Sequence, residues 1–211
     1  MRRIVVVRFG ISNVDSVVRA VEECGHFATL SEDPEAVAAA DVVIVPGQGS
    51  FGEAMERLAR RGLLDALDEA VRRRGVPFLG ICLGMQILAA TGEEGRSGGS
   101  PGLGWVDGRV RRLDGGAERV RIPHVGWNEV VPARVSPLFD GVAEGADFYF
   151  VHSYVLEPAD PTVALATTPY AGGFVSAVQV DNVTGVQFHP EKSQAMGLRL
   201  LANFLKEAGR C

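Results

Sequence analysis

The chain has 211 residues, of which 46% are hydrophobic and 22% are charged, the composition of an ordinary soluble globular protein. This length fits one large domain and buries a sizeable core without disulfides or a structural metal. The net charge of -5 argues against general binding to nucleic acid. No apolar run reaches the ~18 residues that a membrane span needs, so we expect no membrane association.

The three cysteines, Cys24, Cys82 and Cys211, are widely spaced and form no CxxC pair. An odd number without close spacing disfavours both a disulfide framework and a zinc site. We therefore expect free thiols, no bound metal and a reduced, cytoplasmic compartment. We interpret Cys24, at the end of an amphipathic segment, and Cys211, the last residue, as structural or incidental.

The first half of the sequence alternates buried strands with helices. Runs of apolar, mostly β-branched residues predict strands over 4–7, 42–45 and 76–81. The predicted helices cover 12–24 with Ser12 or Asn13 as N-cap, a short segment opened by Asp33-Pro34-Glu35, 51–61, 63–74 and Leu83 to about Ala90. Fully apolar strands separated by helices indicate a parallel sheet covered on both faces.

The second half is rich in strands and follows a predicted loop over 91–103. The predicted strands cover 105–113, 128–131, 148–156, 163–168, 175–180 and 185–188, the last two joined as a hairpin through Asp181-Asn182. A helix over 193–208 closes the chain. We therefore expect one α/β domain over residues 1–211, three layers deep, with a mostly parallel central sheet, flanking helices and an antiparallel, strand-rich extension.

Cys82 lies in Gly80-Ile81-Cys82-Leu83-Gly84, between a buried strand and a helix, which is the arrangement of a nucleophile elbow. Flanking glycines let the backbone turn sharply, and a helix N-terminus favours a thiolate. The Leu83 N–H is well placed to stabilise an oxyanion. The alternative is a small, buried apolar residue, and from this segment alone both interpretations stay open.

A cysteine nucleophile needs a base and a group that orients the base. His189 follows an apolar strand, at the kind of sheet edge where α/β folds assemble their sites. Glu191 can reach back to this imidazole, whereas the alternative is a capping histidine beside a solvated glutamate. Paired with the elbow, the triad is the better explanation. We expect His26 to start a strand, and we keep His124 and His152 as open candidates.

The glycine-rich segment Pro46-Gly47-Gln48-Gly49-Ser50-Phe51-Gly52 also follows a buried strand. Its glycines let backbone N–H groups point into a cleft. A phosphate-binding loop would end in GK[ST], which is missing here, and a plain strand-to-helix turn is the other alternative. We interpret the Gly49 N–H as a second oxyanion donor.

Together these motifs resemble the class I, triad-type glutamine amidotransferases, and more narrowly the glutaminase subunits of imidazole glycerol phosphate synthase. The resemblance runs through nearly the whole chain. It rests on the segments 46–52, 80–86, 123–128, 149–154 and 187–193. The cysteine and His-Pro-Glu segments are shared by the wider superfamily, while 123–128 and 149–154 point to the narrower group.

The resemblance implies that Cys82 attacks the side-chain amide of glutamine, while His189, oriented by Glu191, acts as base and then as acid. A glutamyl thioester forms and is hydrolysed to glutamate. The N–H groups of Leu83 and Gly49 would hold the oxyanion. The residues implied to bind glutamine are Gln86, His152, Ser153 and Tyr154.

The resemblance also implies a partner. In such enzymes the ammonia passes to a separate cyclase subunit, a (β/α)8 barrel, in histidine biosynthesis. It therefore implies a heterodimer with glutamine as substrate and no cofactor. Trp127 and Lys192 fall on segments that face the cyclase. Among 21 basic residues only Lys192 and Lys206 are lysines, which suggests that a lysine is required at position 192.

The sequence departs from the family pattern at three positions, Arg8, Ser12 and Gln48, where aspartate, glycine and valine are more usual. These changes concern contacts beside the active site. Two other functions stay open: an amidotransferase or free-standing cysteine hydrolase that serves another acceptor, and a non-catalytic module that has kept the fold. The intact predicted triad disfavours the module.

Overall fold

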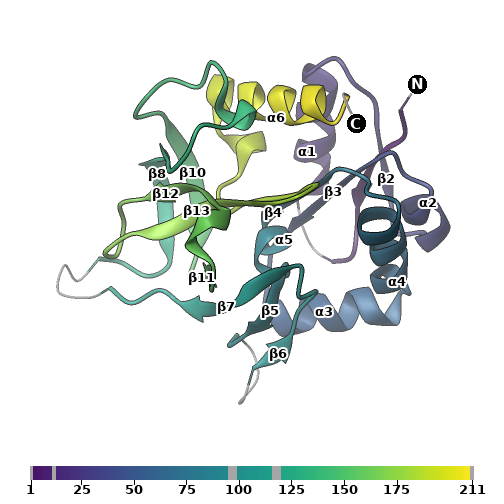
Figure 1. Cartoon of the computed structure of the whole chain (residues 1–211), viewed down its shortest axis with the longest axis horizontal. Coiled ribbons are helices and arrows are strands. Elements are labelled where there is room, and N and C mark those ends of the chain that lie inside the picture. The colour runs from purple at the N-terminus through teal and green to yellow at the C-terminus, as the bar shows by residue number, and fades with distance from the viewer. Residues whose placement is uncertain (1, 11–12, 95–98, 116–119, 210–211) are drawn as a thin grey trace.

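The computed structural model describes residues 2–10, 13–94, 99–115 and 120–209, and an eight-stranded sheet forms its centre (Figure 1). From edge to edge the strands are β2 (Ala28–Ser31), β1 (Ile4–Val7), β3 (Val42–Gly47), β4 (Phe78–Cys82), β14 (Val183–Val186), β13 (Phe174–Val180), β12 (Ala164–Thr168) and β9 (Val131–Pro132). The strands from β2 to β14 run parallel, and β13, β12 and β9 continue the sheet antiparallel. The expected mostly parallel sheet is confirmed.

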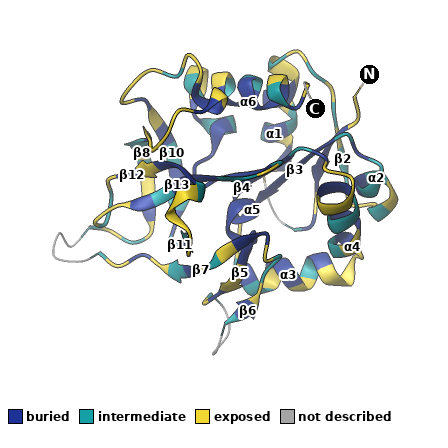
Figure 2. Ribbon diagram, in the orientation of Figure 1, coloured by how far each residue is buried: buried dark blue, intermediate teal, exposed yellow. Residues whose placement is uncertain are grey.

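The parallel strands are buried on both faces. In β1, Ile4 and Val6 belong to one hydrophobic cluster, whereas Val5 and Val7 belong to another. Strand β3 divides its side chains between the same two clusters. Figure 2 shows the central strands in the buried colour, while the outer sides of the surrounding helices are exposed. Continuous apolar runs were therefore a reliable sign of central strands.

Helices cover each face of the sheet, so the fold is three layers deep, as expected (Figure 1). Helices α1 (Val14–Glu23) and α6 (Gln194–Glu207) contact each other and bury side chains in the first cluster. The elements that bury side chains in the second cluster are α2 (Pro34–Ala38), α3 (Phe51–Arg60), α4 (Leu63–Leu67) and the π-helical η1 (Asp68–Arg73). Within the described ranges, no helix is long and apolar enough to span a membrane.

The predicted helix starts differ in their capping. Asp33 accepts a hydrogen bond from the Glu35 N–H at 3.0 Å and so caps α2 as its sequence suggests. Asn13 is the N-cap of α1, yet its side chain makes no capping bond. The other predicted cap, Ser12, lies outside the described residues.

The second half of the chain adds two smaller sheets. One pairs β8 (His124–Glu129) antiparallel with β10 (Asp147–His152). The other contains β11 (Tyr154–Pro158), β7 (Val106–Arg112), β5 (Ala89–Gly92) and β6 (Ser100–Pro101). The predicted hairpin through Asp181-Asn182 is confirmed as β13 and β14. The extent of one domain over 1–211 stays a prediction.

The helix predicted from Leu83 to about Ala90 is wrong beyond its first turn. Helix α5 (Leu83–Gln86) is short, and Ala89 already belongs to β5, which pairs with β7. Strand β5 also pairs antiparallel with β6, so part of the segment 91–103, which was predicted as a loop, forms strands. Residues 95–98 of this segment lie outside the described residues. A short apolar run fits helix and strand equally well, and pairing with a distant strand decides between them.

The strand predicted over 148–156 is two strands that belong to different sheets. The break is at Ser153, whose carbonyl accepts a hydrogen bond from the Leu113 N–H at 2.8 Å. Further boundaries were wrong: β8 begins at His124 rather than at 128, β14 covers Val183–Val186 rather than 185–188, and His26 precedes β2 instead of starting it. β8 carries few apolar residues, so hydrophobicity could not mark its beginning.

The turn between β4 and α5 needs glycine at two positions. A Cβ on Gly84 would overlap the carbonyl oxygen of Val45 in β3, and a Cβ on Gly80 would overlap the carbonyl of Gly84. Between them Cys82 has a φ of 56°, a positive value that is unfavourable for a residue with a side chain. The neighbouring backbone therefore holds Cys82 on a strained corner at the carboxyl end of β4.

We expect Gly84→Ala to lower the free energy of unfolding by about 1–3 kcal/mol or more, because the added methyl group must displace the β3 backbone. Gly10→Ala is the matched control, since its Cβ would approach only the flexible Arg57 side chain. Denaturant unfolding of the two variants gives the comparison. Wild-type stability of Gly84→Ala would contradict this account of the corner.

Candidate active site

Three predicted segments meet at one edge of the central sheet. The glycine-rich segment begins at the end of β3, Cys82 ends β4, and His189 follows β14. Strand β4 lies between β3 and β14, so the carboxyl ends of the three strands are neighbours. This is the edge where parallel α/β sheets hold their sites.

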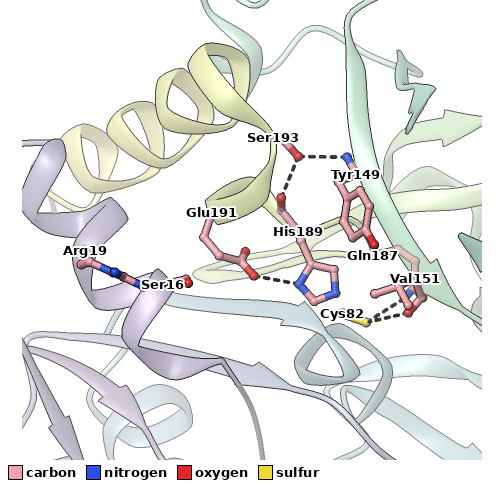
Figure 3. A network of polar contacts seen from close by, with 9 residues as sticks. All are labelled: Ser16, Arg19, Cys82, Tyr149, Val151, Gln187, His189, Glu191 and Ser193. Carbon is pink, nitrogen blue, oxygen red and sulfur yellow. Dashed lines mark hydrogen bonds and ion pairs between the residues drawn. The ribbon is translucent and has the colours of Figure 1, made fainter. Parts of the chain in front are cut away.

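His189 lies between Glu191 and Cys82 (Figure 3). Its Nδ1–H donates to Glu191 Oε1 at 2.8 Å, and both side chains are only 3% exposed. The other ring nitrogen, Nε2, makes no hydrogen bond to any described residue and is turned toward the Cys82 sulfur. Glu191 therefore orients the ring and leaves Nε2 free to exchange a proton beside the sulfur.

The charges around His189 favour its protonated form. Burial alone would lower the pKa of His189, but the Cys82 sulfur and the Glu191 carboxylate outweigh burial and raise that pKa to about 10. The ring is therefore protonated at neutral pH. A protonated imidazole next to the sulfur is the partner that a cysteine nucleophile requires.

Ser193 holds the His189 segment against β10. The Ser193 hydroxyl donates to the His189 carbonyl at 2.6 Å and accepts from the Tyr149 N–H at 3.0 Å. The His189 N–H in turn donates to the Tyr149 carbonyl at 2.9 Å. These bonds fix the backbone of His189, the predicted base, beyond the end of β14 (Figure 3).

A cavity of about 370 Å³ opens in front of Cys82, a volume suited to a small molecule. Its lining consists of Gln48, Gly49, Cys82, Leu83, Gln86, Glu94, Pro123, Val151, His152, Ser153 and Tyr154. The predicted oxyanion donors and the predicted glutamine-binding residues thus surround one space. Gly49 has a φ of 111°, which only glycine adopts freely, so its peptide is well suited to turn an N–H toward the cavity.

Trp127 and Lys192 are brought together by a third residue, Tyr149. The Trp127 ring, 46% exposed on β8, lies edge-on to the Tyr149 ring with centroids 6.0 Å apart. Lys192 Nζ lies 5.6 Å from the centroid of the same Tyr149 ring. The Tyr149 ring also neighbours the His189 ring, at 6.3 Å between centroids. One aromatic ring therefore separates this surface from the predicted base.

Two residues that the sequence analysis left without a role belong to the site. Gln187 is fully buried, and its Nε2 donates to Cys82 Sγ at 3.6 Å. The signal was available, because an extended chain through the strand predicted over 185–188 would put Gln187 on the same side as His189. Glu94 lines the cavity; burial raises its pKa, although the Phe51 N–H stabilises the carboxylate. Glu94 lay in a segment predicted as loop, where no pattern marked it.

The structure shows the contacts of two residues that depart from the family pattern, Arg8 and Gln48. Arg8 pairs with Glu32 at 3.5 Å on the exposed surface, where Arg61 pairs with the same carboxylate. Arg61 and Arg8 together lower the pKa of Glu32. Gln48 lines the cavity beside Gly49, so this departure touches the site directly.

The other thiol of the described residues, Cys24, does not line the site cavity. Cys24 is half-buried against the first hydrophobic cluster, and its Sγ–H donates to the Leu198 carbonyl at 3.5 Å, as a structural residue would. Cys211 lies outside the described residues. The described part of the chain contains no group of three or more His, Cys, Asp or Glu side chains suited to hold a metal ion.

His124 and His152 form a buried pair beside the cavity. The Tyr154 carbonyl, which can only accept, lies 3.0 Å from His152 Nδ1, so this nitrogen carries the proton. His152 Nε2 must then accept from His124 Nδ1, 3.1 Å away. Burial lowers the pKa of His124 to about 4 and that of His152 to about 3. Both rings are therefore neutral.

We expect both rings of this pair to stay neutral, with the proton on Nδ1, between about pH 5 and 8. His189 is the internal contrast, because its raised pKa keeps both of its nitrogens protonated over the same range. Long-range ¹H–¹⁵N spectra of histidine-labelled protein distinguish these states. Titration of the pair near pH 6.5, or a proton on Nε2, would show that the assigned proton positions are wrong.

Comparison with known proteins agrees with the fold and the motifs. The family model described as "Glutamine amidotransferase class-I" matches residues 5–208. A solved structure titled "Crystal structure of glutamine amidotransferase" has a TM-score of 0.75 and 21% identity, covering 97% of this chain and 98% of that one, so the two share a fold. The chain therefore belongs to the class I glutamine amidotransferase family.

Relatives with higher sequence identity indicate a narrower group within this family. "Imidazole glycerol phosphate synthase subunit HisH" of Symbiobacterium thermophilum is 49% identical over 207 residues, which cover 97% of this chain and 93% of the relative. The protein of the same name from Moorella thermoacetica is 45% identical over 204 residues, with coverages of 97% and 94%. The chain is thus a glutamine amidotransferase, and its expected likeness to this subunit is confirmed.

Proposed function

We propose that this chain is the glutaminase subunit of an imidazole glycerol phosphate synthase and acts in a heterodimer with a cyclase subunit, a (β/α)8 barrel. It hydrolyses glutamine to glutamate and ammonia and passes the ammonia to the cyclase for histidine biosynthesis. The arrangement of Cys82, His189 and Glu191 beside the cavity carries the proposal. The described free thiols, Cys24 and Cys82, fit a cytoplasmic location.

In the first half of the reaction, Cys82 Sγ attacks the side-chain amide carbon of glutamine, and the carbonyl oxygen becomes an oxyanion. Protonated His189 gives its Nε2 proton to the amide nitrogen. The C–N bond then breaks, ammonia leaves and a glutamyl thioester remains on Cys82. The Glu191 carboxylate keeps the His189 ring oriented while the ring changes from its protonated to its neutral form.

In the second half, a water molecule gives a proton to neutral His189 Nε2 as its oxygen attacks the thioester carbon. The C–S bond breaks, glutamate leaves, and the sulfur and the protonated ring return to their starting state. The N–H groups of Leu83 and Gly49 stabilise the oxyanion in both halves. Leu83 is suited to this role because it opens α5 directly after the strained corner.

The lining of the cavity suits the amino-acid part of the substrate. Gln86, His152, Ser153 and Tyr154 surround the space beside Cys82 and bind glutamine there. Glu94 is the carboxylate in the described lining, and it binds the α-ammonium group. Burial raises the pKa of Glu94, and an ammonium ligand would favour its ionised form.

Cys82→Ala should abolish glutamine-dependent synthesis by the complex while ammonium-dependent synthesis continues, because only the former needs the thioester. We expect a loss of several orders of magnitude, on the order of 10⁶-fold at most for a lone nucleophile. Assays of the complex with glutamine or ammonium as nitrogen source measure both reactions. Substantial glutamine hydrolysis by Cys82→Ala would exclude the proposed mechanism. Wild-type protein that hydrolyses glutamine but cannot supply the cyclase would point to another acceptor.

Lys192→Ala should weaken association with the cyclase or its stimulation of the glutaminase, with little effect on folding. Lys192 is half-exposed above Tyr149, on the surface that also contains Trp127. If Lys192 pairs with a partner carboxylate and becomes buried, its removal should weaken the binding free energy by about 2–5 kcal/mol. Binding titrations and stimulated rates of Lys192→Ala and Lys192→Arg measure the effect.

Lys206→Ala is the matched control for this experiment, because Lys206 is the other lysine and is exposed on α6. It should bind and respond like the wild type. Wild-type behaviour of Lys192→Ala in both assays would reduce Lys192 to an ordinary surface charge.

A further inference from the structure

A chain of buried polar groups begins at the Cys82 sulfur and runs away from the cavity. Gln187 Nε2 donates to Cys82 Sγ at 3.6 Å. Gln187 Oε1 accepts from Gln86 Nε2 at 3.1 Å, and the same Gln86 nitrogen donates to the Tyr154 carbonyl at 2.8 Å. Gln86 and Gln187 are 4% and 0% exposed, so no bulk water competes for these bonds.

The Tyr154 carbonyl fixes the direction of every bond in this chain. A carbonyl can only accept, so the group of Gln86 that faces it must be the NH₂. That NH₂ also faces Gln187, so Gln187 must present its oxygen to Gln86 and its own NH₂ to Cys82. The amide orientation follows from the bonding partners and leaves a donor, rather than an acceptor, beside the sulfur.

The Tyr154 carbonyl also connects this chain of hydrogen bonds to β8. It accepts a second hydrogen bond from His152 Nδ1, and the ring then accepts from His124 on β8. Both rings are neutral, because burial holds their pKa values at about 3 and about 4. A carbonyl oxygen has two lone pairs, so Tyr154 satisfies Gln86 and His152 together.

Gln187 does not line the cavity. It contacts the sulfur directly, and its other partner, Gln86, is also held by the Tyr154 carbonyl. The Cys82 thiol can also donate to the Val151 carbonyl, 3.9 Å from the sulfur, but this contact needs the thiol proton. When the sulfur is ionised, the Gln187 NH₂ remains beside it as a neutral donor, in addition to the protonated His189 ring. Hydrogen bonds from a neutral donor to an ionised acceptor are stronger than those between neutral groups.

We propose that Gln187 is a positioning residue, which holds the Cys82 sulfur and stabilises its ionised form through an NH₂ group oriented by Gln86, Tyr154 and the His152–His124 pair. The inference rests on the proposed role of Cys82 as the nucleophile. It predicts that loss of the donor makes the thiolate less available without changing the glutamine cavity.

Site-resolved alkylation tests the proposal. Iodoacetamide reacts with the full-length chain over a range of pH, and peptide mass spectrometry separates Cys82 from the other thiols. Gln187→Met removes the donor at similar length, and Gln187→Glu replaces it with an oxygen. Gln179→Met is the matched control, because Gln179 lies on β13 and outside the site cavity.

At the acidic end of the pH range, where less of the sulfur is ionised, we expect alkylation of Cys82 to be about tenfold slower in Gln187→Met than in the wild type, and slower still in Gln187→Glu. The rates should rejoin the wild-type rate at high pH, where the sulfur is ionised in every variant. In the complex, kcat should fall while KM for glutamine stays within about twofold. Pure space-filling by Gln187 would instead slow alkylation equally at every pH, or not at all, and either result overturns the proposal.

A measurement on the unsubstituted protein covers the case in which both variants fail to fold. The side-chain ¹⁵N resonance of Gln187 should move with pH in step with the alkylation of Cys82, and this movement should vanish in Cys82→Ala. A resonance that does not respond to pH overturns the proposal. Glutaminase activity retained in Cys82→Ala would instead refute the proposed function, so the two failures are distinguishable.

Discussion

The close approach of α5 to β3 is the constraint on which the site depends. Gly84 packs against the Val45 carbonyl, and a Cβ added to Gly47 would approach Leu83 Cβ at 3.0 Å. The register of the sheet also pairs Gly47 with Cys82. One backbone contact therefore fixes Cys82, the proposed nucleophile, together with the Leu83 N–H and the start of the glycine-rich segment. A larger residue at any of these glycines would separate groups that the reaction needs together.

Histidines buried in one region of the molecule have opposite charge states, and their neighbours explain why. Burial lowers the pKa of His124 and His152, which face each other, and His152 also faces the Tyr154 carbonyl. His189 is as deeply buried, yet the sulfur and the Glu191 carboxylate raise its pKa. Desolvation is thus common to all three rings, and anionic partners decide which ring becomes the acid. The neutral pair provides fixed dipoles instead of a second cation near the base.

The sequence predicted correctly those elements that are determined by residues close together in the chain. Apolar runs predicted β1, β3 and β4, and the glycines around Cys82 predicted the corner, because burial on both faces and steric limits act within a few residues. The ends of α5 and β10 were missed, since pairing of β5 with β7 and of β11 with β7 decides them from far along the chain. The place of Glu94 in the cavity lining likewise depends on residues distant in the sequence, whereas the position of Gln187, two residues before His189, was a local signal.

The paired strands β8 and β10 connect the proposed partner surface to both halves of the catalytic machinery. Trp127 and Tyr149 are direct partners across this pair, and the Tyr149 backbone holds His189 and Ser193. His124 and His152 are also direct partners there, and they begin the polar chain that ends at Cys82. A small rotation of these two strands would therefore move His189, the proposed base, through Tyr149, and Cys82, the proposed nucleophile, through Gln187. A cyclase bound at Trp127 and Lys192 would act on both groups through one rigid pair of strands, without contacting the substrate cavity.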